Sequence, residues 1–217
     1  MIRTRGLMDA AARPFWNDGG PLLILPQASI PYWEGIDLPS HGRVVHAAFR
    51  WSAPDAAATD YDRACDAGAD SVTKIDVGPS WGIVLGTAAA QSAQWLRLSG
   101  RDELFAVGIE ALFGDDPERL PNLIESVPAT AWRPLLSQAE IGAEGLLLSH
   151  AADRPAEVRE LPAFAVQGDG ELEAALIGDG LRCSISAGIY TVSACDLATP
   201  EGEYLTFVQF ASCAPAL

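Results

Sequence analysis

The stretch WNDGGPLLILP, residues 16–26, decides the fold of this chain. Its Asn-Asp-Gly-Gly segment holds residue types that tolerate positive φ, which predicts a chain reversal. Pro21 lacks a backbone N–H and is expected to begin the strand that follows, while Pro26 is expected to end it or to lie at a sheet edge. Residues 22–25 are all apolar without polar alternation, which is typical of a strand covered on both faces.

The next two segments extend this core toward a short helix. Residues 32–35 read YWEG and place two large aromatic side chains beside a glycine, where the backbone can turn. A helix is expected over residues 60–67, with Thr59 and Asp60 at its N-terminus and Gly68 ending it. Asp60 and Arg63 lie three residues apart on this helix and can pair, so we favour a structural role for them over a functional one.

The remaining chain alternates between strand patterns and turns. A hairpin is expected over residues 71–85, because residues 71–77 alternate apolar and polar and the tripeptide GPS at 78–80 forms a turn. Gly178 to Gly180 is also expected to be a turn. A helix is expected at about 117–127, capped by Asp115 and Asp116. Further strands are expected at residues 95–98, 103–113, 144–150, 171–177, 181–186, 188–194 and 204–210.

These elements predict the α+β class: a mostly antiparallel β-sheet with two or three short helices. The segments GIVL and ELFAV of the first half resemble GIYTV and EYLTF of the second half, which suggests a diverged duplication with a seam near residues 128–140. We therefore expect a single domain over residues 1–217 that could consist of two packed, similar subdomains, 15–130 and 140–213.

The charge of the chain limits its partners. Its 217 residues carry 29 acidic and 14 basic side chains, a net charge of −15. Such a field repels nucleic-acid phosphates and anionic lipid, so we expect neither nucleic acid nor a membrane as partner. No apolar run reaches the length of a membrane span, and no signal peptide is evident, which favours the cytoplasm. The four cysteines show no CxxC spacing, and we expect them to be reduced.

One string matches a catalytic pattern. Residues 78–82 read GPSWG and fit G-x-S-x-G, with Ser80 as the nucleophile, but that motif needs a helix after the serine and a hairpin is expected here. His41, His46 and His150 lack the spacing of a metal site. We therefore expect no catalytic site, metal or cofactor. The alternative is a small hydrolase that uses Ser80, or a ligand-binding protein of unknown substrate.

Several separated residues of the first half form an ordered pattern: Trp16, Gly19, Gly20, Pro21, Pro26, Trp33, Gly35, Asp60, Tyr61, Asp62 and Arg63. On these residues the chain resembles the immunity protein 21 family of bacterial polymorphic toxin systems, and residues 75–77 and 82–86 fit the same pattern. The second half matches it only in its general rhythm, and residues 38–59 and 78–81 depart from it.

The resemblance implies a non-catalytic cytoplasmic protein that binds and neutralises a cognate toxin domain. An acidic inhibitor suits a basic toxin, such as a nuclease. Exposed aromatic side chains would be the natural anchors for such a partner, although the same tryptophans could instead belong to the core. A third alternative is a structural subunit of a secretion-related complex. The candidate toxin contacts are Trp51, Trp95, Trp132, Asp115 and Asp116.

Overall fold

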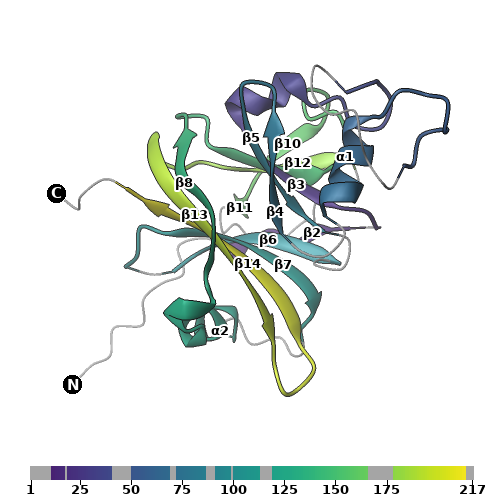
Figure 1. Cartoon of the computed structure of the whole chain (residues 1–217). Coiled ribbons are helices and arrows are strands. Elements are labelled where there is room, and N and C mark those ends of the chain that lie inside the picture. The colour runs from purple at the N-terminus through teal and green to yellow at the C-terminus, as the bar shows by residue number, and fades with distance from the viewer. Residues whose placement is uncertain are drawn as a thin grey trace, which may run out of the picture.

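The computed structural model describes residues 11–17, 19–40, 50–68, 72–86, 91–98, 100–112, 119–165 and 178–213. Within these residues, two six-stranded sheets pack face to face (Figure 1). The first sheet consists, in spatial order, of β10 (Arg159–Pro162), β12 (Asp179–Cys183), β9 (Leu146–His150), β3 (Leu22–Pro26), β5 (Ser80–Leu85) and β4 (Thr73–Val77). The second consists of β2 (Phe15–Trp16), β6 (Ser92–Arg97), β7 (Leu104–Ala111), β14 (Tyr204–Ser212), β13 (Gly188–Ala198) and β8 (Arg133–Ile141).

Short elements complete the fold. The described pairings within the two sheets are antiparallel, except for the parallel pair β10 and β12. A separate antiparallel pair joins β1 (Ala11–Ala12) and β11 (Phe164–Ala165). The helices are α1 (Asp60–Ala67), α2 (Arg119–Ser126) and the 3-10 turns η1 (Gln27–Tyr32) and η2 (Ala129–Ala131). The predicted α+β class with mostly antiparallel sheet is therefore confirmed.

Strand β3 has the environment that its composition predicts. It is hydrogen-bonded to β5 on one side and β9 on the other, and all five of its residues are buried. Because side chains alternate along a strand, Leu22 and Ile24 point into the core between the two sheets. Leu23 and Leu25 point to the opposite face of the first sheet. This strand therefore connects two separate apolar clusters.

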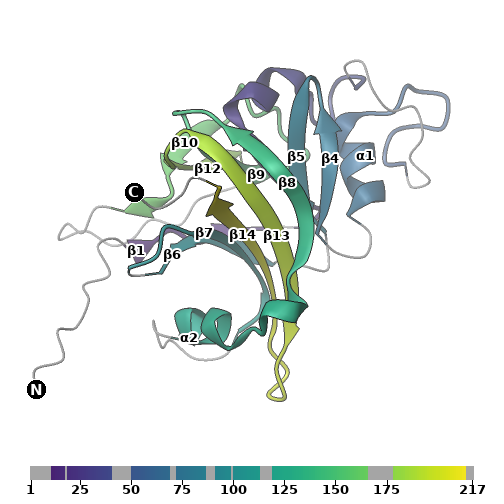
Figure 2. The same cartoon turned by 60° about the vertical axis from the view of Figure 1, so that its left-hand side comes forward.

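Helical segments cover the outer face of each sheet, so the molecule has four layers. On the first sheet, Ile30 of η1 and Ala64 of α1 pack with Leu23, Leu25 and their neighbours. On the second sheet, Leu120 and Ile124 of α2 pack against the outer side chains of β7 and β14. Figure 2 shows α2 against β7 and β14, on the side of the second sheet away from α1.

Helix α1 and the hairpin confirm two sequence predictions. Thr59 and Asp62 form a reciprocal capping box at the start of α1, and Gly68 ends the helix. In the hairpin, Val77 pairs with Ser80 across a two-residue turn. Gly78 in that turn has φ +54°, and a Cβ there would lie 2.3 Å from the ring of Tyr32, so only glycine fits.

Two expectations need correction, and one strand lies where none was expected. Residues 133–141, expected to be part of a seam, form the edge strand β8, which pairs with β13 through β-bulges. The short strand β10 was not expected. Of the expected turn at 178–180, Gly178 does lie in a turn with φ +81°, but strand β12 already begins at Asp179 and ends at Cys183, so the strand expected at 181–186 is displaced. The Asp179 carboxylate accepts hydrogen bonds of 2.9 and 2.8 Å from Arg159 on β10, which ties the two parallel strands together.

The two proposed halves are interleaved. Strand β3 pairs with β9 and strand β7 pairs with β14, so each sheet contains strands from both 15–130 and 140–213. Neither range forms a sheet of its own. The expected strand at 171–177 and the expected helix cap at Asp115 and Asp116 lie outside the described residues.

Candidate functional site

The three tryptophans predicted to contact a partner have three different environments. Trp51 is 65% exposed, Trp132 is half-buried, and Trp95 is fully buried. Asp115 and Asp116 lie outside the described residues, so their position is not part of the site described below. The described candidates are therefore an exposed tryptophan beside α1 and a second tryptophan beside α2.

Trp95 belongs to the core, and its prediction as a surface contact is wrong. Its strand β6 lies between β2 and β7, and its indole points into the space between the sheets. The indole Nε1–H donates a 3.1 Å hydrogen bond to the carbonyl of Leu181, and the ring lies 6.1 Å from that of Phe210. A partner protein cannot reach this side chain, because none of it is exposed to solvent.

Trp51 is held in place by the buried carboxylate of Asp62. The Oδ1 atom of Asp62 accepts hydrogen bonds from the backbone N–H of Trp51 at 2.5 Å and of Ser52 at 3.0 Å. Its Oδ2 atom accepts from the N–H and the hydroxyl of Thr59, at 2.8 and 3.0 Å. Asp62 thus fixes both the N-terminus of α1 and the loop that carries Trp51.

The electrostatics of Asp62 follow from these contacts. Burial alone would raise the pKa of the carboxyl group, but hydrogen bonds from the backbone of Thr59, Ser52 and Trp51 outweigh it and lower the pKa to about 2. Asp62 is therefore ionised at neutral pH. The Trp51 ring meets the ring of Tyr61 edge to face, with centroids 6.2 Å apart. The backbone of Trp51 is fixed by a charge, and its side chain is supported from one side.

Asp60 and Arg63 form the second polar contact of α1, as the structural interpretation predicts. The Asp60 carboxylate accepts hydrogen bonds from the Arg63 guanidinium at 2.7 Å, the Ser40 hydroxyl at 2.6 Å and the backbone N–H of Glu34 at 2.8 Å. Arg63 also donates to the carbonyl of Asp76 and lies 5.9 Å from the centre of the Trp33 ring. This buried network joins α1, the hairpin and the segment after η1.

The remaining residues of the family pattern also make structural contacts. The Trp33 indole donates to the carbonyl of Ala151 at 2.8 Å, and the carbonyl of Pro21 accepts from the Ala151 N–H at 3.0 Å. Gly35 has φ +63°, and a Cβ there would lie 2.3 Å from the carbonyl oxygen of Ala152. Trp16 differs from the rest, because its side chain on β2 is exposed.

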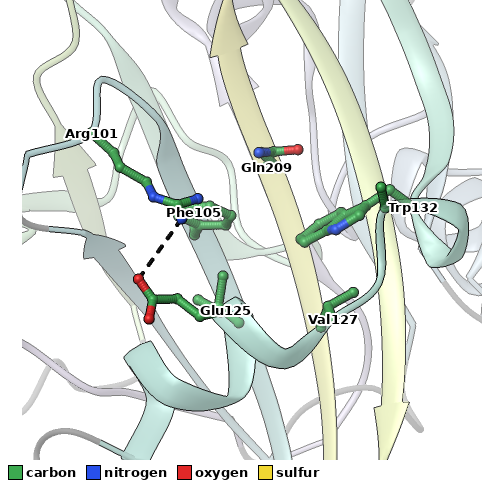
Figure 3. Close-up of a pocket in the computed structure, with 8 residues that line it drawn as sticks. Arg101, Phe105, Glu125, Val127, Trp132 and Gln209 are labelled. Carbon is green, nitrogen blue, oxygen red and sulfur yellow. Dashed lines mark ion pairs between the residues drawn. The ribbon is translucent and has the colours of Figure 1, made fainter.

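A cavity of about 480 Å³ opens beside α2, and Trp132 forms one of its walls (Figure 3). The floor consists of Phe105 on β7 and Gln209 on β14, which are register partners. The mouth carries Arg101 and Glu125, whose charged atoms are 3.8 Å apart. Of these residues only Trp132 was predicted to contact a partner, because the others come from separate elements and carry no shared motif.

Ser80 does not have the setting of a nucleophile elbow. It is the first residue of β5 in a hairpin, so a strand follows it where the motif requires a helix. His150 on β9 aligns with Leu22, which aligns with Leu85 on β5, five residues from Ser80. At about 3.3 Å per residue, the two side chains are offset by roughly 16 Å along the strand direction. Ser80 and His150 therefore do not form a catalytic pair.

The remaining candidates for chemistry are the possible metal ligands and the cysteine thiols. Among the described residues, no group of three or more His, Cys, Asp or Glu side chains lies close enough to hold a metal ion, and His41 and His46 lie outside that part of the chain. All four cysteines are free thiols, of which Cys213 is exposed and Cys183 and Cys195 are buried. Burial raises the pKa of the Cys183 thiol to about 11, despite the opposing effect of Arg97, so it stays protonated.

Comparisons with known proteins add no relative. No family model, curated protein or solved structure matches this chain. None of the helices in the described ranges is both long and apolar enough to cross a membrane.

Proposed function

We propose that this protein is a cytoplasmic immunity protein, which binds a cognate bacterial toxin domain and blocks it without catalysis of its own. The observation that carries the proposal is the pairing of a highly exposed Trp51 side chain with a backbone fixed by the buried Asp62. Tryptophan is enriched among the residues that dominate binding energy at protein interfaces. A fixed backbone lowers the entropy lost when such a side chain is immobilised by a partner.

The charge of the chain supports a basic partner. A net charge of −15 attracts a cationic protein over distances beyond direct contact, and this steering raises the association rate. A basic nuclease is the toxin type that fits this field best. The resemblance of the first half to immunity protein 21 sequences supports a toxin domain as the partner, whereas its basic character rests on the charge alone.

The direct test uses the toxin domain encoded by the gene adjoining that of this protein. Expression of the toxin alone should arrest growth, and co-expression of this chain should restore it. Purified toxin should bind the wild-type chain, and Trp51→Ala should weaken binding by about thirtyfold, the effect of losing a hot-spot residue. Tyr204→Ala, which removes another exposed aromatic side chain from the far end of β14, should leave affinity unchanged.

The outcomes separate the proposal from its alternatives. Failure of the wild-type chain to restore growth, or the absence of an adjoining toxin gene, would contradict the immunity function. Equal affinity of Trp51→Ala and wild type would place the interface elsewhere. Esterase activity that is lost in Ser80→Ala would favour the hydrolase alternative. An association rate that is indifferent to ionic strength would remove the electrostatic part of the proposal.

A further inference from the structure

The cavity beside α2 has an aromatic wall that is held rigidly. Trp132 lies between η2 and β8, and its ring packs against Phe105 and Phe207, with centroid distances of 6.1 and 6.5 Å. Phe105 and Phe207 are buried, so they fix the indole from the protein side. Figure 3 shows the indole beside the cavity, opposite Arg101 and Glu125. The π-face of tryptophan is the strongest aromatic partner for a cation.

The charged mouth of the cavity can exchange partners. The Arg101 and Glu125 side chains are 47% and 56% exposed, and their 3.8 Å separation is longer than a hydrogen bond. An ion pair of this kind contributes little free energy, because both groups remain hydrated. A cation that enters the cavity can therefore replace Arg101 at the Glu125 carboxylate at small cost.

The floor of the cavity adds an oriented amide. The Oε1 atom of Gln209 accepts a 3.1 Å hydrogen bond from the Ser193 hydroxyl on the neighbouring strand β13. This contact fixes the direction of the amide at the bottom of the cavity. The cavity thus combines an aromatic wall, a carboxylate at the mouth and a polar floor, within a volume of about 480 Å³ that is in the range of binding pockets.

A cation fits this site better than an anion. The mouth carries one positive and one negative side chain, so it does not favour either sign of ligand. The net charge of −15 on the whole chain attracts positive groups and therefore favours a cation. A guanidinium is planar, so it can stack on an indole while it bonds a carboxylate through two N–H groups. A lysine ammonium is a compact, strongly hydrated charge and cannot make both contacts in the same way.

We propose that this cavity binds an arginine side chain of the partner protein, stacked on Trp132 and paired with Glu125 in place of Arg101. This inference rests on the proposed function for the identity of the partner. The site itself can be tested without the toxin.

The test is an NMR titration of the wild-type chain with acetyl-arginine-amide, following the indole N–H signal of Trp132. The signal is assigned by its loss in Trp132→Phe. We expect a saturable shift with a dissociation constant on the order of 10 mM, as befits one side chain. Acetyl-norleucine-amide, which has a similar apolar stem without charge, should give no saturable shift. Acetyl-glutamate-amide should also give none.

Two variants should change the affinity for arginine in opposite directions. Glu125→Gln should weaken arginine binding about threefold, because it removes the carboxylate partner. Arg101→Gln should strengthen it, because it removes the competing cation. Equal binding of norleucine, no saturable shift with arginine, or binding of glutamate that Arg101→Gln weakens would each overturn the proposal. A chemical-shift map of each variant identifies misfolding.

The toxin assay then tests whether this cavity is part of the interface with the toxin. If the wild-type chain neutralises its toxin, Glu125→Gln should lower affinity for that toxin, while Tyr204→Ala should not. Wild-type affinity of Glu125→Gln would overturn the role of the cavity in the interface and leave the immunity function intact. Conversely, failed neutralisation by the wild-type chain would contradict the immunity function without changing the titration result.

Discussion

The carboxylate of Asp62, buried at the N-terminus of α1, accepts a 2.5 Å hydrogen bond from the backbone N–H of Trp51. A buried residue in the first turn of α1 thereby fixes the backbone that carries the exposed Trp51 side chain. Stability and the geometry of the candidate interface are coupled through this one group, which makes Asp62 the natural starting point for mutagenesis.

Asp62→Asn should lower the free energy of unfolding by about 2–3 kcal/mol. An amide is isosteric but lacks the charge, and one of its two polar atoms is a donor facing backbone N–H groups, so the hydrogen bonds to Thr59 and to Trp51 cannot all be kept. Urea unfolding measures the change. Asp55→Asn, at an exposed position of the loop that precedes α1, is the control and should change stability by less than about 0.5 kcal/mol.

The contribution of Asp62 should disappear in acid. Its folded-state pKa of about 2 lies below its ordinary value of 3.8, so its stabilising effect is complete above the ordinary value and is lost as the pH falls toward 2. The shift corresponds to about 2 kcal/mol. The difference in unfolding free energy between wild type and Asp62→Asn should shrink between about pH 5 and pH 2. A difference that is constant over this range would contradict the assignment.

The buried pair of Asp60 and Arg63 should show strong coupling. Asp60→Asn removes the negative charge and leaves the Arg63 guanidinium buried without its counterion, which should cost about 3–5 kcal/mol. Adding Arg63→Met to that variant should recover part of the loss, since no unpaired charge remains. A double-mutant cycle by urea unfolding gives the coupling energy. Additive effects would show that the two side chains act independently.

Gly35→Ala should destabilise the protein more than Gly100→Ala. Both glycines have positive φ, +63° and +77°, so both substitutions strain the backbone by about 1 kcal/mol. At Gly35 a Cβ would also lie 2.3 Å from the carbonyl oxygen of Ala152, whereas no atom lies within 4 Å of a Cβ at Gly100. The difference between the two melting temperatures therefore measures the cost of the steric clash. Equal temperatures would contradict the close packing at Gly35.

Trp95→Ala should destabilise the protein far more than Trp51→Ala, because Trp95 is buried and Trp51 is exposed. Loss of the buried Trp95 indole leaves a cavity between the sheets and should cost about 3–5 kcal/mol. Trp51→Ala removes a mostly exposed side chain and should change stability by under about 1 kcal/mol. Thermal unfolding compares them. A large loss of stability in Trp51→Ala would remove the argument that its side chain is available for binding.

The sequence predicts the parts of this fold that depend on local chemistry. Residues 22–25 are apolar at every position, and this pattern identifies a strand covered on both faces. Thr59 and Asp60 are residue types that favour a helix N-terminus, and together with Gly68 they identify the bounds of α1. In both cases the physical cause lies within a few residues of the element that it specifies.

The parts that were missed depend on contacts between distant residues. The pairing of β8 shifts register near Tyr190 and Val192, so the polar and apolar positions of β8 lose the period of two that would reveal a strand. Pro134 is tolerated there because β8 is an edge strand. Burial of Trp95 follows from the order of the strands, and exposure of Trp51 follows from the loop that Asp62 holds. Neither is contained in a local pattern. The α2 cavity likewise gathers side chains from separate elements.

The position of β3 between β5 and β9 has a consequence for synthesis on the ribosome. Leu22 is made early, but its partner His150 in β9 emerges only after most of the chain has been translated. At about 5–20 residues per second, the apolar strand waits on the order of ten seconds with one side unpaired. The first half therefore cannot complete its fold before β9 has been translated. A chain that terminates before β9 would expose the edge of β3, and we expect such fragments to be cleared or to aggregate rather than accumulate as a folded half.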